Sequence, residues 1–174
     1  MSLALRPCTR AEARAAVQRW HRTHKPHVQQ RLAIGLEDSG ALVAILVLED
    51  PKAAALRNGR TWEVTRRVVG PYAPHCAASM LLGAAWRAAS GAGVRRLVSY
   101  IRHDEVGTCY RAAGWVPTAW VRPEEWDGKR KPGRWLPGLH IPSTETCARI
   151  RWEIGPDSAS TRVKRSGDGS WRAA

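Results

Sequence analysis

The sequence predicts a single α/β (α+β) domain with a mixed central sheet flanked by helices. Apolar segments rich in β-branched residues are typical of strands and recur at 31–37, 41–49, 61–69, 95–101 and 147–154. Helical spacing of apolar residues separates them at about 10–21 and 75–90. This alternation indicates a layered domain. A chain of 174 residues is long enough to bury one such core without disulfides or metal.

The first elements expected are a helix and a hairpin. Thr9 and Glu12 have the spacing of a capping box, which predicts that a helix begins at about residue 10. The segments 31–37 and 41–49 flank a short polar turn and are expected to pair. The second of them is apolar on both faces, so we expect it in the middle of its sheet.

The middle of the chain is expected to form strand 61–69, a loop containing Gly70, and a long helix over about 75–90. A strand at 95–101 and a short helix near 105–113 follow, and residues 115–121 are extended. The helix over 75–90 would begin directly after a strand. Its unpaired backbone N–H groups would then be available to bind an anionic phosphate.

The last third of the chain is expected to be less regular. Residues 122–142 contain four prolines and three glycines, which predicts a long loop, and 147–154 is the last expected strand. Ser, Gly and Arg dominate from 155 onward, which favours a disordered basic tail over 155–174. The folded domain is therefore expected to span residues 1–154.

Charge and composition narrow the classes of partner. Lys and Arg total 28 against 15 acidic residues, a formal charge of +13, and such a surface attracts polyanions. A nucleic-acid partner is the first interpretation, and a merely solvated, compositionally biased surface is the second. No apolar stretch has the length of a membrane span, no secretory leader is evident, and the four cysteines form no CxxC pair. We expect a reduced, cytoplasmic protein without a membrane partner.

Four segments carry a resemblance to a known family: 21–26 (HRTHKP), 59–66 (GRTWEVTR), 79–85 (SMLLGAA) and 107–115 (GTCYRAAGW). Together with the strand–loop–helix order at 61–90, they resemble the GNAT acyltransferase superfamily over roughly residues 10–121. Within that superfamily, the chain most resembles the phage and mobile-element proteins related to the Mom DNA-modification protein. This resemblance implies a GNAT-like sheet and transfer of an acyl group from acetyl-CoA, or a related acyl-CoA, to a nucleobase amine in DNA.

The cofactor turn departs from the usual GNAT pattern. Typical members have Arg/Gln-x-x-Gly-x-Gly/Ala, whereas Arg67 here leads to a single glycine, Gly70, followed by two prolines. That leaves fewer free amides for a pyrophosphate. Two other functions therefore stay open: acylation of a small-molecule or protein amine, and nucleic-acid binding without catalysis.

The candidate cofactor-binding residues lie on the strand end, the turn and the starts of two helices. Arginine pairs bidentately with phosphate, and a serine hydroxyl one turn into the helix can add a donor. As surface charges the arginines would carry no such role. The candidates are Arg66, Arg67, Val68, Val69, Gly70, His75, Ser79 and Thr108.

Three residues are candidates for catalysis. Strand alternation places Glu63 and Thr65 on one face, where Glu63 can act as a general base or instead form an Arg salt bridge at a sheet edge. The resemblance makes Tyr110 the acid that protonates the departing thiolate, and the alternative is a core tyrosine under the cofactor arm. His24 is a candidate base or nucleic-acid contact, or part of an exposed polar turn.

A metal site is not expected. His21, His24 and His27 recur every three residues, a spacing that can bring two imidazoles together. The sequence offers no clear third and fourth ligand for them.

The predicted nucleic-acid contacts combine cations with flat aromatic rings. Such a combination suits contact with the phosphate backbone plus base stacking, and a base to be modified must first leave the duplex stack. The alternative is that the tryptophans cover the core. The candidates are Lys25, Arg122, Trp126, Lys129, Arg130, Lys131 and Trp135.

Overall fold

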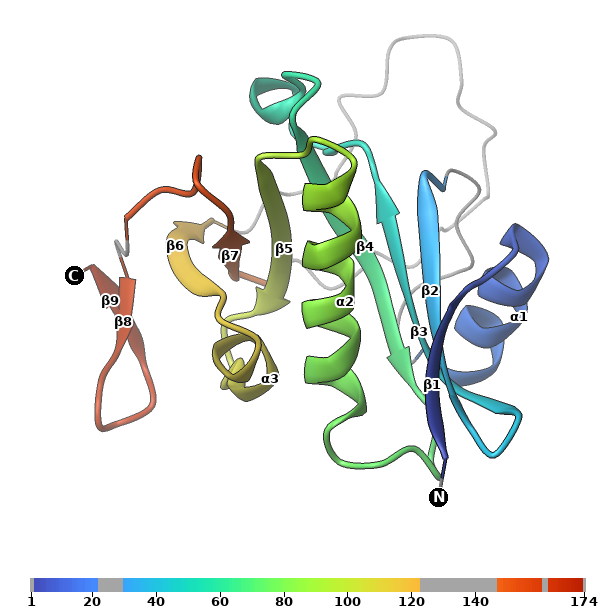
Figure 1. Ribbon diagram of the computed structural model, residues 1–174. Helices are drawn as coiled ribbons and strands as arrows, with labels where there is room; N and C mark the ends of the chain where they lie inside the picture. Colours follow the sequence, from blue (N-terminus) through green and yellow to red (C-terminus); the bar gives the residue numbers. More distant parts are fainter. Residues whose placement is uncertain (1, 22–29, 123–146, 161–162, 174) are drawn as a thin grey trace, which may run out of the picture.

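The computed structural model describes residues 2–21, 30–122, 147–160 and 163–173 (Figure 1). Within them, seven strands form one sheet in the order β1-β2-β3-β4-β5-β7-β6. The strands are β1 (Leu3–Pro7), β2 (Leu32–Asp38), β3 (Ala41–Glu49), β4 (Thr61–Val69), β5 (Arg96–Arg102), β6 (Val116–Val121) and β7 (Arg149–Ile154). The helices are α1 (Arg10–Trp20), α2 (Ala77–Gly91) and α3 (Thr108–Ala112), with a 3-10 turn η1 (Ala54–Leu56). The predicted fold class is confirmed.

Helix α1 begins at the predicted capping box. The Thr9 hydroxyl accepts a hydrogen bond from the Glu12 N–H at 3.3 Å, and the Glu12 carboxylate accepts one from the Thr9 N–H at 2.8 Å. The helix then packs Ala13 and Val17 against one face of the sheet, where they meet Val47 of β3.

Helix α2 covers the opposite face (Figure 1). Leu81 and Leu82 of α2 are buried with Leu46 and Leu48 of β3 and with Val64 of β4. Strand β3 therefore has apolar residues on both faces, because alternate side chains reach α2 and α1. Its place between β2 and β4 confirms the prediction of a central strand.

Strands β4 and β5 run side by side for only part of their length. They pair in parallel from Thr61 opposite Arg96 to Val64 opposite Ser99, whereas β3 pairs with β4 as far as Val69. Figure 1 shows the two strands diverging as they run away from η1. We call the point just past the Val64–Ser99 pair the fork.

A β-bulge lies on the β4 side of the fork. Val47 of β3 is opposite Arg66 and Leu48 is opposite Val64, which leaves Thr65 as the extra residue. The bulge corrects the expectation that Glu63 and Thr65 alternate regularly on one face. Arg66 instead shares the α1 face with Glu63, and Arg67 shares the α2 face with Val64.

The tail differs from its expected disorder. Strands β8 (Val163–Arg165) and β9 (Trp171–Ala173) form an antiparallel hairpin. Val163 and Trp171 are buried in the core on the α2 side, where the Trp171 ring meets Trp152 edge-on at 5.8 Å between centroids. The apolar pair anchors a segment whose composition is otherwise polar, so the folded part extends past residue 154.

None of the helices in the described ranges is long and apolar enough to cross a membrane. The four cysteines, Cys8, Cys76, Cys109 and Cys147, are free thiols.

Candidate active site

The Tyr110 hydroxyl lies at the fork. Helix α3 follows β5 and begins after Gly107, whose φ of 70° is left-handed and where a Cβ would overlap the Trp152 ring. This start places the Tyr110 oxygen 2.8 Å from the Ser99 hydroxyl, which in turn donates to the Val64 carbonyl at 3.4 Å. A carbonyl only accepts, so Tyr110 is the donor to Ser99.

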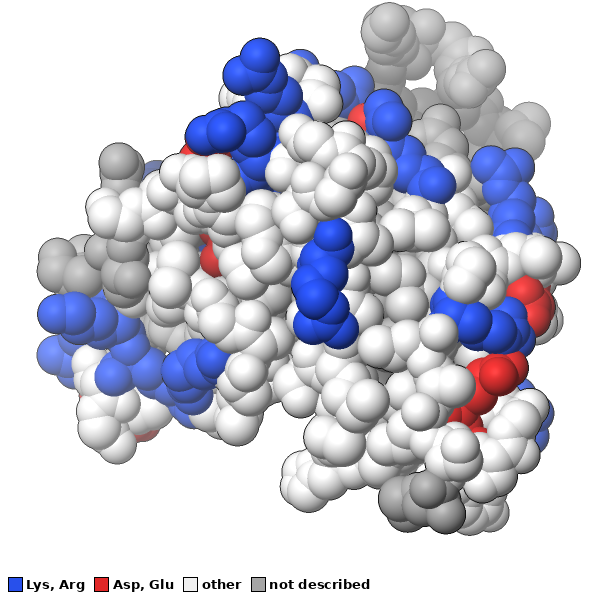
Figure 2. Space-filling model, in the orientation of Figure 1, with Lys and Arg blue, Asp and Glu red and all other residues white. Residues whose placement is uncertain are grey.

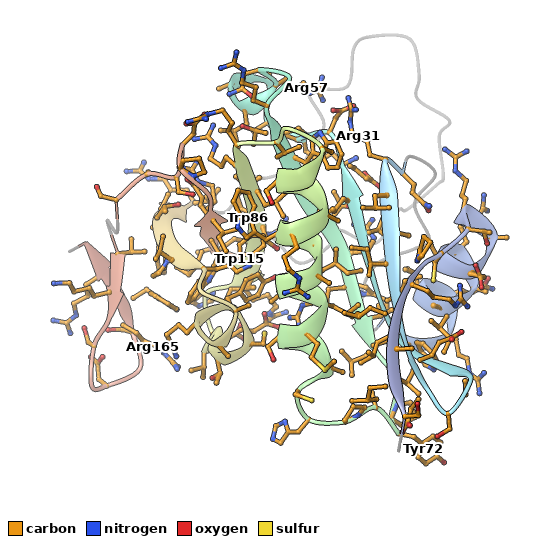
Figure 3. All side chains as sticks on the ribbon, viewed as in Figure 1. Arg31, Arg57, Tyr72, Trp86, Trp115 and Arg165 are labelled. Atoms are coloured by element: carbon orange, nitrogen blue, oxygen red, sulfur yellow. The ribbon has the colours of Figure 1, made fainter. Side chains whose placement is uncertain are left out.

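Tyr110 is also a core residue. It is 3% exposed, its ring stacks on Trp152 at 5.4 Å between centroids, and it meets Trp115 edge-on at 5.6 Å. Figure 3 places Trp115 beside α3. Burial raises the pKa of the phenol, while the Arg67 charge and the Ser99 hydrogen bond oppose that rise. The two alternatives for this tyrosine thus describe one placement: a packed ring with its hydroxyl at the fork.

Arg67 reaches across the fork from β4 to α3. Its guanidinium carbon lies 5.3 Å from the centroid of the Tyr110 ring, a cation–π contact. The Nε atom is buried and has no hydrogen-bond partner within the described residues. A cation and an ionisable hydroxyl are therefore neighbours where β4 and β5 part.

The β4 backbone past the fork has one edge without a strand partner. Residues 66–69 pair with β3 only, so about half of their N–H and C=O groups point toward the space that β5 leaves. Val68 turns its side chain into the core under α1, and Val69 is exposed. Because Gly70 donates to the Val43 carbonyl, strand alternation turns the backbone groups of Val68 toward β3. Those of Val69 point toward the space that β5 leaves.

The turn after β4 is not the expected row of free amides. The Gly70 N–H donates to the Val43 carbonyl at 2.8 Å, and the Ala73 N–H donates to the Gly70 carbonyl at 3.2 Å. A Cβ on Gly70 would lie 2.9 Å from the Val43 oxygen and 3.1 Å from the Trp20 ring. Gly70 is therefore a packing glycine, and its amide is not available to a phosphate, which corrects that prediction.

Free donors appear one step later, in the first turn of α2. The helix begins at Ala77, and the Ala77 N–H donates to the Pro74 carbonyl at 2.9 Å. Among the described residues, nothing accepts from the amides of Ala78 and Ser79. Ser79 adds a hydroxyl, which donates to the Cys76 carbonyl at 2.9 Å and keeps lone pairs free.

Two further cofactor candidates lie at the margins of this region. His75 is exposed and precedes α2, so it lies in the turn and not in the predicted helix. Thr108 is the exposed first residue of α3. Tyr72, which no sequence pattern had singled out, projects from the same turn and is 92% exposed (Figure 3).

Glu63 lies on the other face of the sheet, toward α1. It is 6% exposed, and its Oε2 accepts from the Lys52 N–H at 2.8 Å. Its register partner Glu49 is 1% exposed and forms an ion pair with the Lys52 ammonium at 2.7 Å. Burial raises the pKa of Glu63, Lys52 opposes the rise, and the Glu49 charge adds to it.

This environment differs from the alternative of an edge salt bridge. Strand β4 is internal to the sheet, and within the described residues no arginine or lysine forms an ion pair with Glu63. A buried carboxylate with a raised pKa is chemically suited to accept a proton.

Three residues of this region escaped the sequence analysis: Ser99, Glu49 and Lys52. Their contacts depend on strand register, because Ser99 is opposite Val64 and Glu49 is opposite Glu63. The one available signal is an acidic residue at the end of an otherwise apolar strand, which fits Glu49.

Most of the predicted nucleic-acid contacts fall outside the described residues. These are Lys25, Trp126, Lys129, Arg130, Lys131 and Trp135, together with the candidate base His24. Arg122 is described and exposed, directly after β6. Figure 2 shows Lys and Arg side chains gathered at the β8–β9 end and near η1, with few acidic side chains on that face. Arg165 and Arg57 mark these two regions in Figure 3.

The fold is that of solved GNAT acetyltransferases. An acetyltransferase of the GNAT family from Streptococcus pneumoniae has a TM-score of 0.59 and 14% identity, with 88% of this chain and 99% of that chain covered. An IAA acetyltransferase from Bacillus cereus has a TM-score of 0.63 and 15% identity, with 88% of this chain and 99% of that chain covered. A putative acetyltransferase from Salmonella typhimurium, solved with its cofactor acetyl-CoA, has a TM-score of 0.60 and 15% identity. The match covers 92% of this chain and 98% of that chain.

Among curated proteins, no significant match to the chain is found. A model of the Mom protein family, in contrast, matches residues 2–127. These residues are more than half of the chain, and the protein therefore belongs to the Mom protein family and has the fold of the GNAT acetyltransferases.

Proposed function

We propose that the protein transfers an acyl group from an acyl-CoA, acetyl-CoA or a related thioester, to a nucleobase amine in DNA. The observation that carries this proposal is the fork, where β4 and β5 part beside the Tyr110 hydroxyl in a Mom-family chain with a GNAT fold. A GNAT-fold acetyltransferase from Bacillus subtilis is solved in complex with CoA, and the Salmonella typhimurium protein with acetyl-CoA.

The residues present fit an acyl-CoA. The unpaired backbone edge of residues 66–69 offers hydrogen bonds to an extended amide-containing arm, and the amides of Ala78 and Ser79 offer donors to phosphate. Arg67 contributes a buried donor that has no protein partner among the described residues. When bound, the acyl-CoA supplies an activated acyl carbon, which the amine nitrogen attacks as the carbon–sulfur bond breaks and thiolate leaves.

Glu63 takes the proton that the amine must lose. Its carboxylate faces the α1 side of the sheet, and burial with the adjacent Glu49 charge raises its pKa. A base whose pKa moves toward neutrality combines the correct charge state with enough driving force. The transfer takes place directly or through one water, and His24 is the second candidate for this proton.

Tyr110 serves the opposite side of the reaction. Its hydroxyl lies on the α2 face of the fork and donates to Ser99, so a small rotation redirects the proton to the leaving sulfur. The stacked Trp152 ring fixes the phenol in place. Base and acid thus act from opposite faces of the sheet.

Charge supports DNA as the acceptor. The formal charge of +13 favours a polyanion, and the exposed Arg122 follows β6. The loop residues Trp126 and Trp135, with Lys25, Lys129, Arg130 and Lys131, are the proposed contacts to backbone and bases, by stacking and phosphate neutralisation. The base to be modified would have to leave its stack.

The test is mass spectrometry of nucleosides from DNA of cells that express the protein. The proposal expects one nucleoside with added acyl mass, absent from cells that express Glu63→Gln at equal level. Unmodified DNA together with acylation of small amines or proteins would point to the small-molecule or protein acceptor instead. Absence of any acyl product, with CoA not bound by the purified protein, would leave only the nucleic-acid-binding function.

A further inference from the structure

Arg67 is a half-buried cation at the fork, and among the described residues it forms no ion pair with a carboxylate. Its Nε makes no hydrogen bond within the described residues, and there Glu105 contributes an electrostatic attraction but no ion pair. Burial of a guanidinium is unfavourable unless an anion or several acceptors compensate. The Tyr110 ring at 5.3 Å compensates in part through a cation–π contact.

The neighbouring residue of β4, Arg66, does have carboxylates near its side chain. Arg66 points to the opposite face, where Glu49 and Glu63 act on it electrostatically, and one of its Nη atoms donates to the Thr65 carbonyl at 2.6 Å. The bulge at Thr65 sets these orientations. Of two consecutive arginines, one therefore faces carboxylates and the other faces the acid candidate Tyr110.

We propose that Arg67 is a catalytic residue whose fixed positive charge stabilises the negative charge released when the thioester bond breaks. The inference rests on the proposed function, because it requires an acyl thioester at the fork. The carbon–sulfur bonding pair goes to sulfur, and Tyr110 then transfers its proton to that sulfur. The phenolate oxygen recovers a proton from solvent, which has received the amine proton by way of Glu63. Arg67 faces the negative charge at both stages.

The weak acidity of the Tyr110 phenol explains why the Arg67 charge would assist the reaction. Burial raises the pKa of Tyr110, which makes the phenol a weaker acid toward a thiolate. A fixed cation beside the hydroxyl offsets that effect by stabilising the phenolate. Arginine suits this role because its guanidinium stays protonated throughout.

The first experiment compares two ligands by isothermal titration calorimetry between pH 6 and pH 10. CoA carries the thiol, and desulfo-CoA lacks only the sulfur. An opposite charge within about 4–6 Å lowers a pKa by about 1–3 units, so CoA should gain about 10- to 1,000-fold in affinity over desulfo-CoA as pH rises. Parallel pH dependence of the two ligands in the wild type would overturn the inference while the cofactor site stands.

Three variants assign the effect to one side chain. In Arg67→Met the affinity difference between CoA and desulfo-CoA at high pH should disappear, and Arg67→Lys should keep most of it. Arg31→Met removes an arginine whose cation–π contact is with Trp62, outside the fork, and should retain the full effect. Equal behaviour of Arg67→Met and wild type would rule out the role.

Turnover supplies an independent readout. Removal of one preorganised group that stabilises developing negative charge reduces kcat by about 10²–10³-fold, and we expect Arg67→Met in that range. Melting curves by circular dichroism check that each variant is folded. If neither CoA nor desulfo-CoA binds the wild type, the proposed function itself fails, which is a different outcome from loss of the pH effect alone.

Discussion

Glu63 and Tyr110 lie on opposite faces of the sheet, yet both lie next to the Val64–Ser99 pair, where β4 and β5 part. Glu63 precedes Val64, and the Tyr110 hydroxyl contacts Ser99, the register partner of Val64. A reaction centred on the fork would therefore have a proton acceptor on the α1 side and a proton donor on the α2 side.

Replacement of Tyr110 by Phe should reduce kcat by about 10²–10⁴-fold, the usual contribution of a positioned acid. Affinity for acyl-CoA should stay nearly constant, because the ring and its packing on Trp152 remain. Steady-state kinetics and calorimetry give the two quantities. Tyr72→Phe, on an exposed tyrosine, is the matched control and should behave as wild type. Undiminished turnover in Tyr110→Phe would eliminate the acid role.

The activity should fall as pH decreases through the raised pKa of Glu63, because only the carboxylate accepts a proton. Glu63→Gln should remove that limb of the pH profile of kcat/KM and lower the plateau by about 10²–10⁴-fold. Glu37→Gln is the control, since Glu37 is bonded to Arg6 in the β1–β2 region. An unchanged profile in Glu63→Gln would transfer the base role to His24 or to water.

Glu63 should also destabilise the folded protein at high pH. A carboxyl whose folded pKa is raised above its unfolded value binds more protons when folded, so it favours folding at low pH. That contribution is lost as pH rises from the unfolded value of 4.5 through the folded one. Relative to Glu63→Gln, the free energy of unfolding of wild type should fall by about 1.4 kcal/mol for each unit by which folding raises the pKa of Glu63. Chemical unfolding at several pH values measures this difference. A difference independent of pH would contradict this account of the burial.

The C-terminal hairpin should contribute to stability. Trp171→Ala removes a buried indole that packs on Trp152 and should reduce the free energy of unfolding by about 3–5 kcal/mol. Arg172→Ala, next to it and exposed, should cost less than about 1 kcal/mol. Urea denaturation measures both. Equal stability of the two variants would mean that the tail does not join the core.

DNA binding should depend steeply on salt. Each neutralised phosphate contributes about −0.9 to the slope of log K against log salt concentration, so replacing Lys129, Arg130 and Lys131 by Gln should reduce the slope by about 2.7. Fluorescence anisotropy with one duplex at several salt concentrations gives this slope. If the triple variant kept the wild-type slope, these three cations would not contact phosphate.

The sequence was sufficient for the framework of the fold. Period-two and period-3.6 patterns located the six strands from residue 31 to 154 and helices α1 and α2, and Thr9 with Glu12 fixed the start of α1. It was insufficient for β1, which is short, contains Pro7 and becomes a strand only by pairing with β2. The β8–β9 hairpin depends in the same way on two distant buried residues, Val163 and Trp171.

The candidate site was reached only in part, because its contacts depend on register. Tyr110 and Glu63 were found from the family resemblance and strand position. The bulge at Thr65 decides which face Arg66 and Arg67 occupy, and no local sequence pattern indicates it. Gly70 illustrates the same limit, since its role follows from the approach of Trp20 and Val43, which are remote in sequence.

Hydrogen–deuterium exchange with and without CoA tests the central claim most directly. We predict slower exchange at the backbone amides of residues 66–69 that face away from β3 and at Ala78 and Ser79, with no change in β1. The Gly70 amide, already bonded to Val43, should be protected in both states. Binding of CoA without protection at these positions, or protection confined to another surface, would contradict the account of the fork as the site of acyl transfer.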